Sequence, residues 1–402
     1  MRNGNHWIGV LGLALLFHGI AWADDAKHQV TVSAGESERI DTPVSFAVPR
    51  EIPAGALQLS AADNSLLPLQ VSPDGIAHFI LPHLAAHQDA TFRIVSAAIA
   101  PPAVEIATDG TTLLVSAGGK EILRYQAEKS DLPAGFDPAY ARGGYIKEVL
   151  TPTGKLVTDD YPPNHKHHHG IWSPWTKTVF EGRHPDFWNM GDKTGSVEFV
   201  DHADPWSGPV CAGFTTHHRF MDLSAKPDPK IALNETWDLI VYRPMGTDKP
   251  YYLFDLTITQ TCAPPTPLLL PTYRSGGLGF RGNRAWDGKA NTTFLTSEGK
   301  TRSNGNESRG RWCHISGLVD GVVAGIAILD APTDFRFPQP MRIHPTEPFF
   351  CFAPSQLGDW QIDPGTPYVA KYRFIVADGP ADAGFLNRAW EDYGSPPGVK
   401  VE

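Results

Sequence analysis

The densest group of side chains able to do chemistry is a run of four histidines within residues 164–172, NHKHHHGIW. Imidazole can coordinate a metal ion and can transfer protons near neutral pH, because its unperturbed pKa is about 6.5. In an extended segment side chains alternate, so His165, His167 and His169 would share one face. The alternative is a polar loop, or histidines hydrogen-bonded within a sheet. Four histidines in five positions favour a functional site.

Aromatic and acidic side chains follow the histidines in a second segment, residues 181–190, EGRHPDFWNM. Its Gly and Pro predict a loop, and loops on a rigid β scaffold commonly carry sites. Tryptophan rings here and just upstream could stack on the apolar faces of sugar rings, although filling a sandwich core is the alternative for each of them. The candidate substrate-binding residues of these segments are Trp172, Trp175, Asp186 and Trp188.

Arginines mark two further segments. Residues 273–281, YRSGGLGFR, combine three glycines with flanking arginines, which predicts a tight turn lining a cleft in which a guanidinium could clamp a carboxylate or hydroxyls. Residues 334–348 form a proline-stiffened loop that holds a histidine and a carboxylate, the minimum for acid and base steps. Ion pairs among these charges are the alternative. The candidates are Arg281, Arg342, His344 and Glu347 for catalysis, and Arg274 and Arg336 for substrate binding.

A histidine pair at positions 217 and 218 lies in a predicted strand, so His217 and His218 should face opposite sides, with one of them structural. His217 is also a candidate ligand in a second hypothesis, in which the histidines bind a metal ion. His165 and His167, with a distant His217 or His344, could surround zinc, copper or another divalent ion. A divalent metal is thus the cofactor hypothesis, and the cofactor stays open.

The first residues predict export from the cytoplasm. Arg2 precedes an apolar run over residues 7–20, and Ala21-Trp22-Ala23 fits a cleavage site, so we expect a signal peptide over residues 1–23 and a periplasmic or secreted protein. No later stretch approaches the roughly 18 apolar residues of a membrane helix. We therefore expect no membrane span.

Composition excludes several classes of function. A net charge of −10 without a basic stripe argues against nucleic acid, and small neutral substrates fit it better than polyanions; we expect a small-molecule or glycan substrate. No Gly-x-Ser-x-Gly elbow, HExxH helix or nucleotide fingerprint occurs, which sets aside serine hydrolases, zincins and dehydrogenases. The four cysteines include no CxxC pair; an oxidising compartment would permit a disulfide, and buried small hydrophobes are the alternative.

Short alternating runs separated by turn residues predict an all-β fold in two parts. Residues 24–102 read as a small N-terminal β-sandwich module, with strands near 29–32, 44–48, 77–81 and 90–95 and a linker at its end. Residues 103–402 predict a larger antiparallel domain, with strands at 231–242, 251–260, 322–329 and 368–376. Only residues 381–393 have helical character, and this helix should cap a sheet.

The segments HKHHHGIWSPW, PDFWNMG, YRSGGLGFRG and RIHPTEPFFCFAPS resemble the bacterial exported family labelled "methane oxygenase PmoA", over most of the mature chain. Members of that family are similar to galactose mutarotase-like β-supersandwich proteins, so the resemblance implies such a supersandwich and sugar chemistry. The family's first motif usually reads Asp-His-Pro-His-His-Arg-Gly, which carries over His165, His167 and His168 as site residues. Asn164 and His169 depart from it. Where the family commonly has Lys-Glu, residues 274 and 275 are Arg and Ser.

The leading hypothesis is an exported carbohydrate-active enzyme, a lyase, epimerase or hydrolase, that uses histidine acid–base chemistry. Arg281 or Arg342 would stabilise developing negative charge, and Glu347 or His344 would replace the carboxylate missing at position 275. Hydrolysis would require two carboxylates at a workable separation. The alternatives are a metal-dependent enzyme built on the histidines and a non-catalytic glycan-binding protein. All require the histidines and these arginines to converge in one solvent-reaching hollow.

Overall fold

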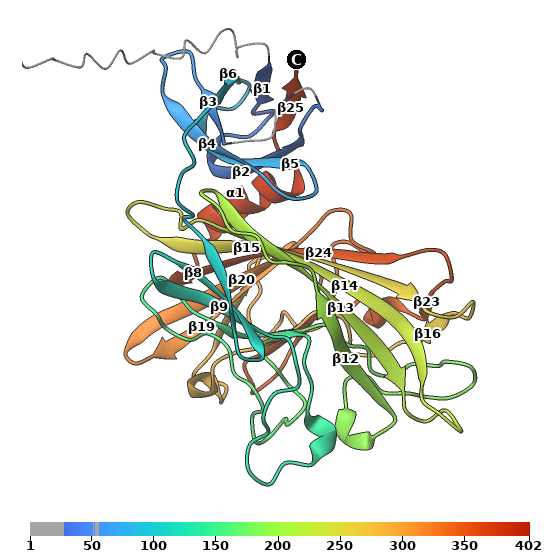
Figure 1. Ribbon diagram of the computed structural model, residues 1–402. Helices are drawn as coiled ribbons and strands as arrows, with labels where there is room; N and C mark the ends of the chain where they lie inside the picture. Colours follow the sequence, from blue (N-terminus) through green and yellow to red (C-terminus); the bar gives the residue numbers. More distant parts are fainter. Residues whose placement is uncertain (1–27, 51, 53–55) are drawn as a thin grey trace, which may run out of the picture.

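The computed structural model describes residues 28–50, 52 and 56–402. Their regular structure is almost entirely antiparallel strand, which confirms the predicted all-β class. The strands form one seven-stranded sheet, two eight-stranded sheets and a two-stranded ribbon (Figure 1). The predicted signal peptide lies outside the described residues. Among the described residues, no helix has the length and apolar character needed to cross a membrane.

The seven-stranded sheet folds around a core of its own and forms the predicted N-terminal module. Its core residues alternate along each strand, as Val30 and Val32 do, because successive strand residues face opposite sides. The last strand of the chain also joins it, pairing antiparallel with the first, so the module contains a segment from the far end of the sequence. The predicted domain boundaries themselves remain a prediction. In sheet order the strands are β2 (Arg39–Ala47), β5 (Ile76–Leu84), β4 (Leu66–Val71), β3 (Leu57–Ser60), β6 (Asp89–Ser96), β1 (Gln29–Ser33) and β25 (Gly398–Val401).

The two eight-stranded sheets pack face to face as a large β-supersandwich, which confirms the predicted architecture. We call them the first and second sheets. The first is β12 (Gly195–His202), β13 (Cys211–Asp222), β14 (Lys230–Tyr242), β15 (Tyr251–Cys262), β24 (Tyr368–Asp378), β20 (Val322–Asp330), β19 (Trp312–Val319) and β18 (Thr293–Thr296). The second is β21 (Met341–Ile343), β22 (Phe349–Phe352), β17 (Gly279–Arg281), β11 (Ile171–Trp172), β10 (Tyr145–Val149), β9 (Lys120–Gln126), β8 (Thr112–Ala117) and β7 (Glu105–Asp109).

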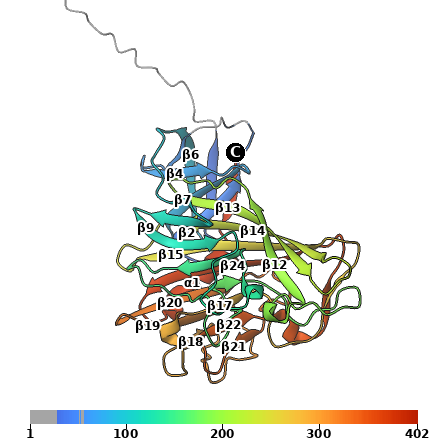
Figure 2. The same ribbon diagram turned by 60° about the horizontal axis from the view of Figure 1, so that its bottom comes forward.

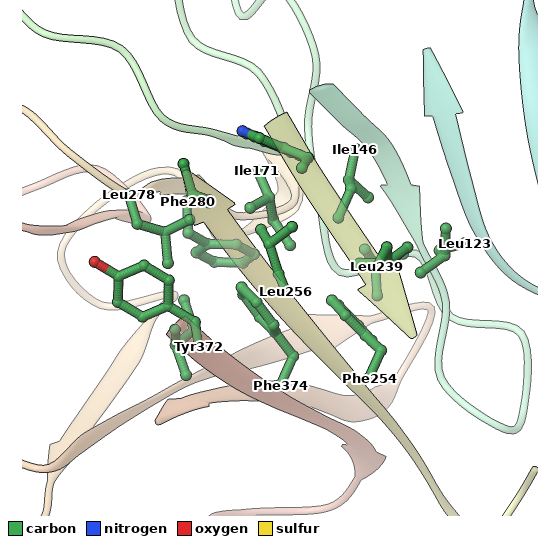
Figure 3. Close-up of a cluster of buried hydrophobic side chains, with 14 of the residues drawn as sticks. Leu123, Ile146, Ile171, Leu239, Phe254, Leu256, Leu278, Phe280, Tyr372 and Phe374 are labelled. Atoms are coloured by element: carbon green, nitrogen blue, oxygen red, sulfur yellow. The ribbon is translucent and has the colours of Figure 1, made fainter. Parts of the chain in front are cut away.

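One continuous apolar core fills the space between these sheets. Figure 3 shows Ile171 and Phe280 of the second sheet directed toward Leu256 and Phe374 of the first. The four long strands predicted between residues 231 and 376 all lie in the first sheet as β14, β15, β20 and β24, and β14 and β15 form the predicted hairpin. All four cysteines are free, and three of them are buried.

The one α-helix of the described residues, α1 (Ala383–Gly394), lies between the N-terminal module and the supersandwich (Figure 1). Its Leu386 and Trp390 pack on the outer face of the first sheet, so it caps that sheet as predicted. Arg39 of β2 ties the module to the helix, since its Nη1 lies 3.0 Å from Asp392 Oδ1. The remaining elements are the ribbon β16 (Leu268–Leu270) and β23 (Trp360–Ile362), and the 3-10 turns Pro138–Tyr140, Met190–Asp192, Arg284–Trp286 and Pro354–Leu357.

The outer face of the second sheet has a small core of its own. Phe350 and Phe352 of β22 point into the main core, whereas Phe349 and Cys351 point outward and pack with Trp172. The strands beneath this second core, β17, β22 and β21, lie side by side (Figure 2). This outer face is where the sequence-predicted candidates gather.

Candidate functional site

Strand alternation places two rows of candidate residues on the outer face of the second sheet. Arg281 pairs with Phe349, and the Phe349 carbonyl accepts the backbone N–H of His344 at 3.0 Å. The neighbouring row begins at Arg342, which pairs with Cys351. The residues next to them along each strand, Phe280, Ile343 and Phe350, point into the main core. Their packing there holds both rows of outward residues in place.

The histidine segment itself is not extended, and the predicted sharing of a face by residues 165, 167 and 169 is wrong. It begins with two prolines, and two tight turns follow, in which the Pro162 carbonyl accepts His165 N–H and the His165 carbonyl accepts His168 N–H. His169 turns away under the loop, where its Nδ1 lies 2.7 Å from Asp160 Oδ1. Proline-initiated turns therefore override the period-two pattern.

Four imidazoles converge above the sheet, and we call them the histidine cluster. His165 stacks on His168 with ring centroids 4.6 Å apart, His167 lies 4.8 Å from His168, and His344 lies 5.7 Å from His165. His168 is buried, while the other three are partly exposed. The structure thus brings together His165, His167 and His168, the three positions suggested by family resemblance, with His344 from the distant proline-rich loop.

Aromatic rings form the floor of the cluster. His168 lies 4.7 Å from Phe349 and 5.1 Å from Trp172, and Trp188 packs 5.0 Å from Trp172. The rings of Trp172 and Trp188 are 0% and 5% exposed, so no face is open for the expected stacking on a sugar. That expectation is corrected: these tryptophans position the histidines.

Asp186 also has a positioning role rather than the predicted contact with substrate. Its Oδ1 accepts the backbone N–H groups of Trp188 and Asn189, at 2.9 and 2.8 Å, and its Oδ2 accepts the Thr176 hydroxyl at 3.0 Å. These hydrogen bonds satisfy both carboxylate oxygens and fix the loop that carries Trp188. The loop in turn holds the Trp188 ring against Trp172.

Arg281 anchors a pair of carboxylates beside the cluster. Its Nη2 donates to Asp287 Oδ1 at 2.6 Å and to Glu347 Oε2 at 3.2 Å, so the two carboxylates share one guanidinium nitrogen. Asn164 Nδ2 donates to the same Glu347 oxygen at 2.8 Å. Asp287 was missed by sequence reasoning. Only its place six residues after Arg281 signalled it, because the 3-10 turn at residues 284–286 brings it back to the guanidinium.

The carboxylates titrate in opposite directions. Burial raises the pKa of Asp287, Arg281 opposes this, and the nearby charge of Glu347 adds to the increase. Burial also acts to raise the pKa of Glu347, but hydrogen bonds from Asn164 and the charge of Arg281 outweigh it and lower that pKa. Pairs of carboxyl groups separated in this way can supply one acid and one base.

The histidine cluster is uncharged at neutral pH. Burial lowers the pKa of His167 to about 4, with help from His165 and His169, and burial and Arg342 lower the pKa of His344 to about 4. Burial likewise lowers the pKa of His165 and, to a greater degree, of His168. Neutral imidazoles can donate and accept hydrogen bonds at once.

His344 has an assigned tautomer. Its Nδ1 accepts the backbone N–H groups of Glu347 at 3.0 Å and Thr346 at 3.3 Å, so this nitrogen carries a lone pair. The proton of the neutral ring therefore sits on Nε2. His344 can donate from Nε2, and its other nitrogen is already occupied.

Buried polar atoms without partners concentrate at this site. They are Arg281 Nε and Nη1, His165 Nδ1, His168 Nδ1, His169 Nε2 and Trp172 Nε1. Buried polar groups are normally hydrogen-bonded, because leaving one unpaired costs about 1–3 kcal/mol. Six such atoms lie in or directly beneath the partly exposed histidine cluster.

Two predicted substrate-binding residues lie elsewhere and are corrected. Trp175 is 1% exposed in the main core, where its Nε1 donates to Gln260 Oε1 at 2.7 Å. Arg336 Nη1 donates to the carbonyls of Pro354 and Gly358, at 2.7 and 2.8 Å, so it holds a loop. Composition alone could not separate a core tryptophan from a surface one.

His217 is also remote from the cluster. His218 points into the main core toward Tyr125, so His217 points from the outer face of the first sheet, with the whole sandwich between it and the histidine cluster. Within residues 28–50, 52 and 56–402, no group of three or more His, Cys, Asp or Glu side chains is arranged to hold a metal ion. The proposed metal set of His165, His167 and His217 is therefore wrong.

Comparison with known proteins gives one family and no activity. A solved structure described as an alpha-mannosidase from Enterococcus faecalis V583 aligns with a TM-score of 0.39 and 10% identity, over 93% of this chain and 46% of that one. The chain thus spans about half the length of that protein. No curated protein matches the sequence. Residues 112–391 match a family model described as a family of unknown function, DUF6807, and that description lends no support to the methane-oxygenase label. The chain belongs to the family DUF6807.

Proposed function

We propose that this protein is a carbohydrate-active enzyme that works by proton transfer at the histidine cluster and the Asp287–Glu347 pair. The observation that carries the proposal is the set of six buried polar atoms without partners beneath the cluster. A folded protein leaves such atoms unpaired chiefly where a ligand or water satisfies them. The floor of rigid aromatic rings fixes their positions.

The chemistry of the group suits a polyhydroxylated substrate. Neutral imidazoles both donate and accept, as sugar hydroxyls do, and Asn164 adds an amide at the exposed edge. Arg281 is fully buried beneath this group and holds Asp287 and Glu347 in place through Nη2. The resemblance to galactose mutarotase-like proteins points to the same class of substrate.

The separation of the carboxylates favours elimination or epimerisation over hydrolysis. Glycoside hydrolysis needs carboxyl groups about 5–9.5 Å apart, with room for water or for a glycosyl intermediate. Here Asp287 and Glu347 both accept from one guanidinium nitrogen, Arg281 Nη2. Two carboxylates held side by side on one nitrogen do not leave room between them for a glycosidic bond.

The residues then have complementary roles. Glu347 or the lone pair of neutral His167 takes a proton from a sugar carbon. In elimination the C–H electron pair becomes a carbon–carbon double bond, the neighbouring C–O bond breaks, and His344 Nε2 or Asp287 protonates the leaving oxygen. In epimerisation the proton returns to the opposite face of the same carbon, and no bond to oxygen breaks.

A glycan panel tests the proposal. Ultraviolet absorbance detects the unsaturated product of elimination, exchange of solvent deuterium into recovered sugar detects epimerisation, and new reducing ends detect chain cleavage. The activity should disappear in Glu347→Gln and persist in Arg219→Gln, a change to an exposed residue of β13. Glycan binding without turnover, unchanged in Glu347→Gln, would instead make the protein a non-catalytic binder.

A further inference from the structure

We infer that the substrate carries an anionic group, a carboxylate or a sulfate, and that Arg342, Arg274 and Lys177 bind it beside the histidine cluster. The inference rests on the proposed function and adds a substrate class to it. We call these three residues the cationic subsite. Its position, its anchoring and its lack of ion pairs carry the inference.

The position follows from strand geometry. Arg342 lies in β21, two residues before His344 and on the same outward side, with Ile343 between them in the main core. Two residues of strand span about 7 Å. An anionic group on Arg342 would therefore place the same sugar, or its neighbour, over the cluster.

The loop that carries Arg274 is anchored against the same sheet. The backbone N–H of Tyr273 donates to the Ser355 carbonyl at 3.2 Å, and Gln356 Nε2 donates to the Arg274 carbonyl at 3.0 Å. The Tyr273 ring contacts two cations, with Lys177 Nζ at 5.4 Å and the Arg274 guanidinium carbon at 5.8 Å from its centroid. A rigid aromatic spacer thus holds two positive groups in place.

The cationic subsite is not neutralised by an ion pair within the part of the chain that the structure describes. None of its three residues forms an ion pair there. Arg342 Nη1 donates to Asn306 Oδ1 at 2.9 Å, a neutral partner, while Glu307 acts on it only from a distance. Arg281, by contrast, is neutralised by two carboxylates.

Gathering unpaired cations on a protein of net charge −10 costs mutual repulsion, which Arg274 and Arg342 exert on each other. An anion removes that cost and gains charge-assisted hydrogen bonds. A uronate fits the proposed chemistry especially well. Binding its carboxylate to arginine withdraws charge from the adjacent carbon, whose proton then becomes easier to remove.

Calorimetric titration with three oligosaccharides of equal length tests the inference: one derived from polygalacturonate, one from a sulfated galactan and one from a neutral galactan. The wild type should bind at least one acidic oligosaccharide about tenfold tighter than the neutral one, a difference of about 1.4 kcal/mol, because charge-assisted hydrogen bonds to the anion add to the affinity. The double variant Arg274→Gln/Arg342→Gln should lose that preference and keep its affinity for the neutral chain. Arg219→Gln should keep both, and added salt should weaken only acidic binding.

Comparison of the two acidic oligosaccharides shows whether the subsite recognises a carboxylate or a sulfate. Equal affinity for neutral and acidic chains, or a preference that survives in the double variant, overturns the cationic subsite while leaving a carbohydrate function in place. Failure of the folded wild type to bind all three chains, with no turnover on the glycan panel, overturns the proposed function as well. Thermal unfolding of each variant establishes that it is folded.

Discussion

Two groups of buried polar side chains lie on opposite faces of the second sheet and differ in how well they are satisfied. In the main core, Gln260 Nε2 donates to Glu235 Oε1 at 2.7 Å, Glu235 Oε2 lies 2.7 Å from His218 Nδ1, and His218 Nε2 lies 2.6 Å from the Tyr125 hydroxyl. Trp175 extends this chain, which we call the inner network. On the outer face, the atoms beneath the histidine cluster lack partners.

The difference separates the histidine of the inner network from the histidines of the cluster. A fully satisfied polar network rigidifies a core and specifies one packing, whereas a partly satisfied one costs free energy for each open donor or acceptor. The inner network has no open atom on Glu235, His218 or Gln260 among the unsatisfied groups of the described residues. Only the outer group retains capacity to bind. Histidine content alone does not mark a site.

The largest expected effect is on turnover. Glu347→Gln should reduce the activity found on the glycan panel by about 10²–10⁴-fold, the usual contribution of a general acid or base. The amide keeps the size and the contact with Asn164 but cannot take a proton. The measurement is kcat on the active glycan, with thermal unfolding as the control for folding. Turnover within a few fold of the wild type would remove Glu347 from the mechanism.

The inner network should respond in stability rather than in chemistry. Glu235→Ala removes the acceptor of both His218 and Gln260, and breaking a buried pair in this way costs about 3–5 kcal/mol. The measurement is the free energy of unfolding from a denaturant titration. Turnover per folded molecule should stay close to that of the wild type. A stable variant with lost turnover would reverse the roles of the two groups.

The fold was predictable because its long strands alternate cleanly. β14 and β15 carry polar and apolar residues in turn and have a Pro-Met-Gly turn near their junction, so local pattern and tertiary structure agree. The pairing of β25 with β1 of the N-terminal module was not predictable, since the four residues of β25 have no pattern that specifies their partner strand. Long-range pairing of short strands depends on the space that the rest of the fold leaves.

The site was predictable only in part. Residue types identified His165 and His344, the family resemblance added His168, and the structure brings the three together. The direction of His169 and the contact of Asp287 with Arg281 depend on tight turns, which local periodicity does not describe. Burial of the tryptophans depends on loop packing, which a single sequence does not encode in a readable pattern.

Acid should lower the stability of the folded protein because it protonates the histidine cluster. His167 and His344 have pKa values of about 4 in the folded chain and about 6.5 when unfolded, so between these values the unfolded chain binds more protons. The stability they contribute is complete above about pH 7 and is lost as pH falls from 6.5 toward 4. We expect the midpoint of thermal unfolding to fall over this window, and to fall less in His167→Gln. A parallel decline in both proteins would contradict the assignment to His167.

The smallest expected effect is at His217, and it completes the comparison among the histidines. This imidazole is exposed on the outer face of the first sheet, where its Nδ1 pairs with Asp201 at 2.5 Å. Exposed pairs contribute about 0–1 kcal/mol because water and salt screen them. His217→Ala should therefore leave turnover and metal content unchanged and alter the free energy of unfolding by less than about 1 kcal/mol. Loss of a bound metal or of turnover in this variant would connect His217 to the histidine cluster on the other side of the molecule, and the cluster would then not be the whole of the site.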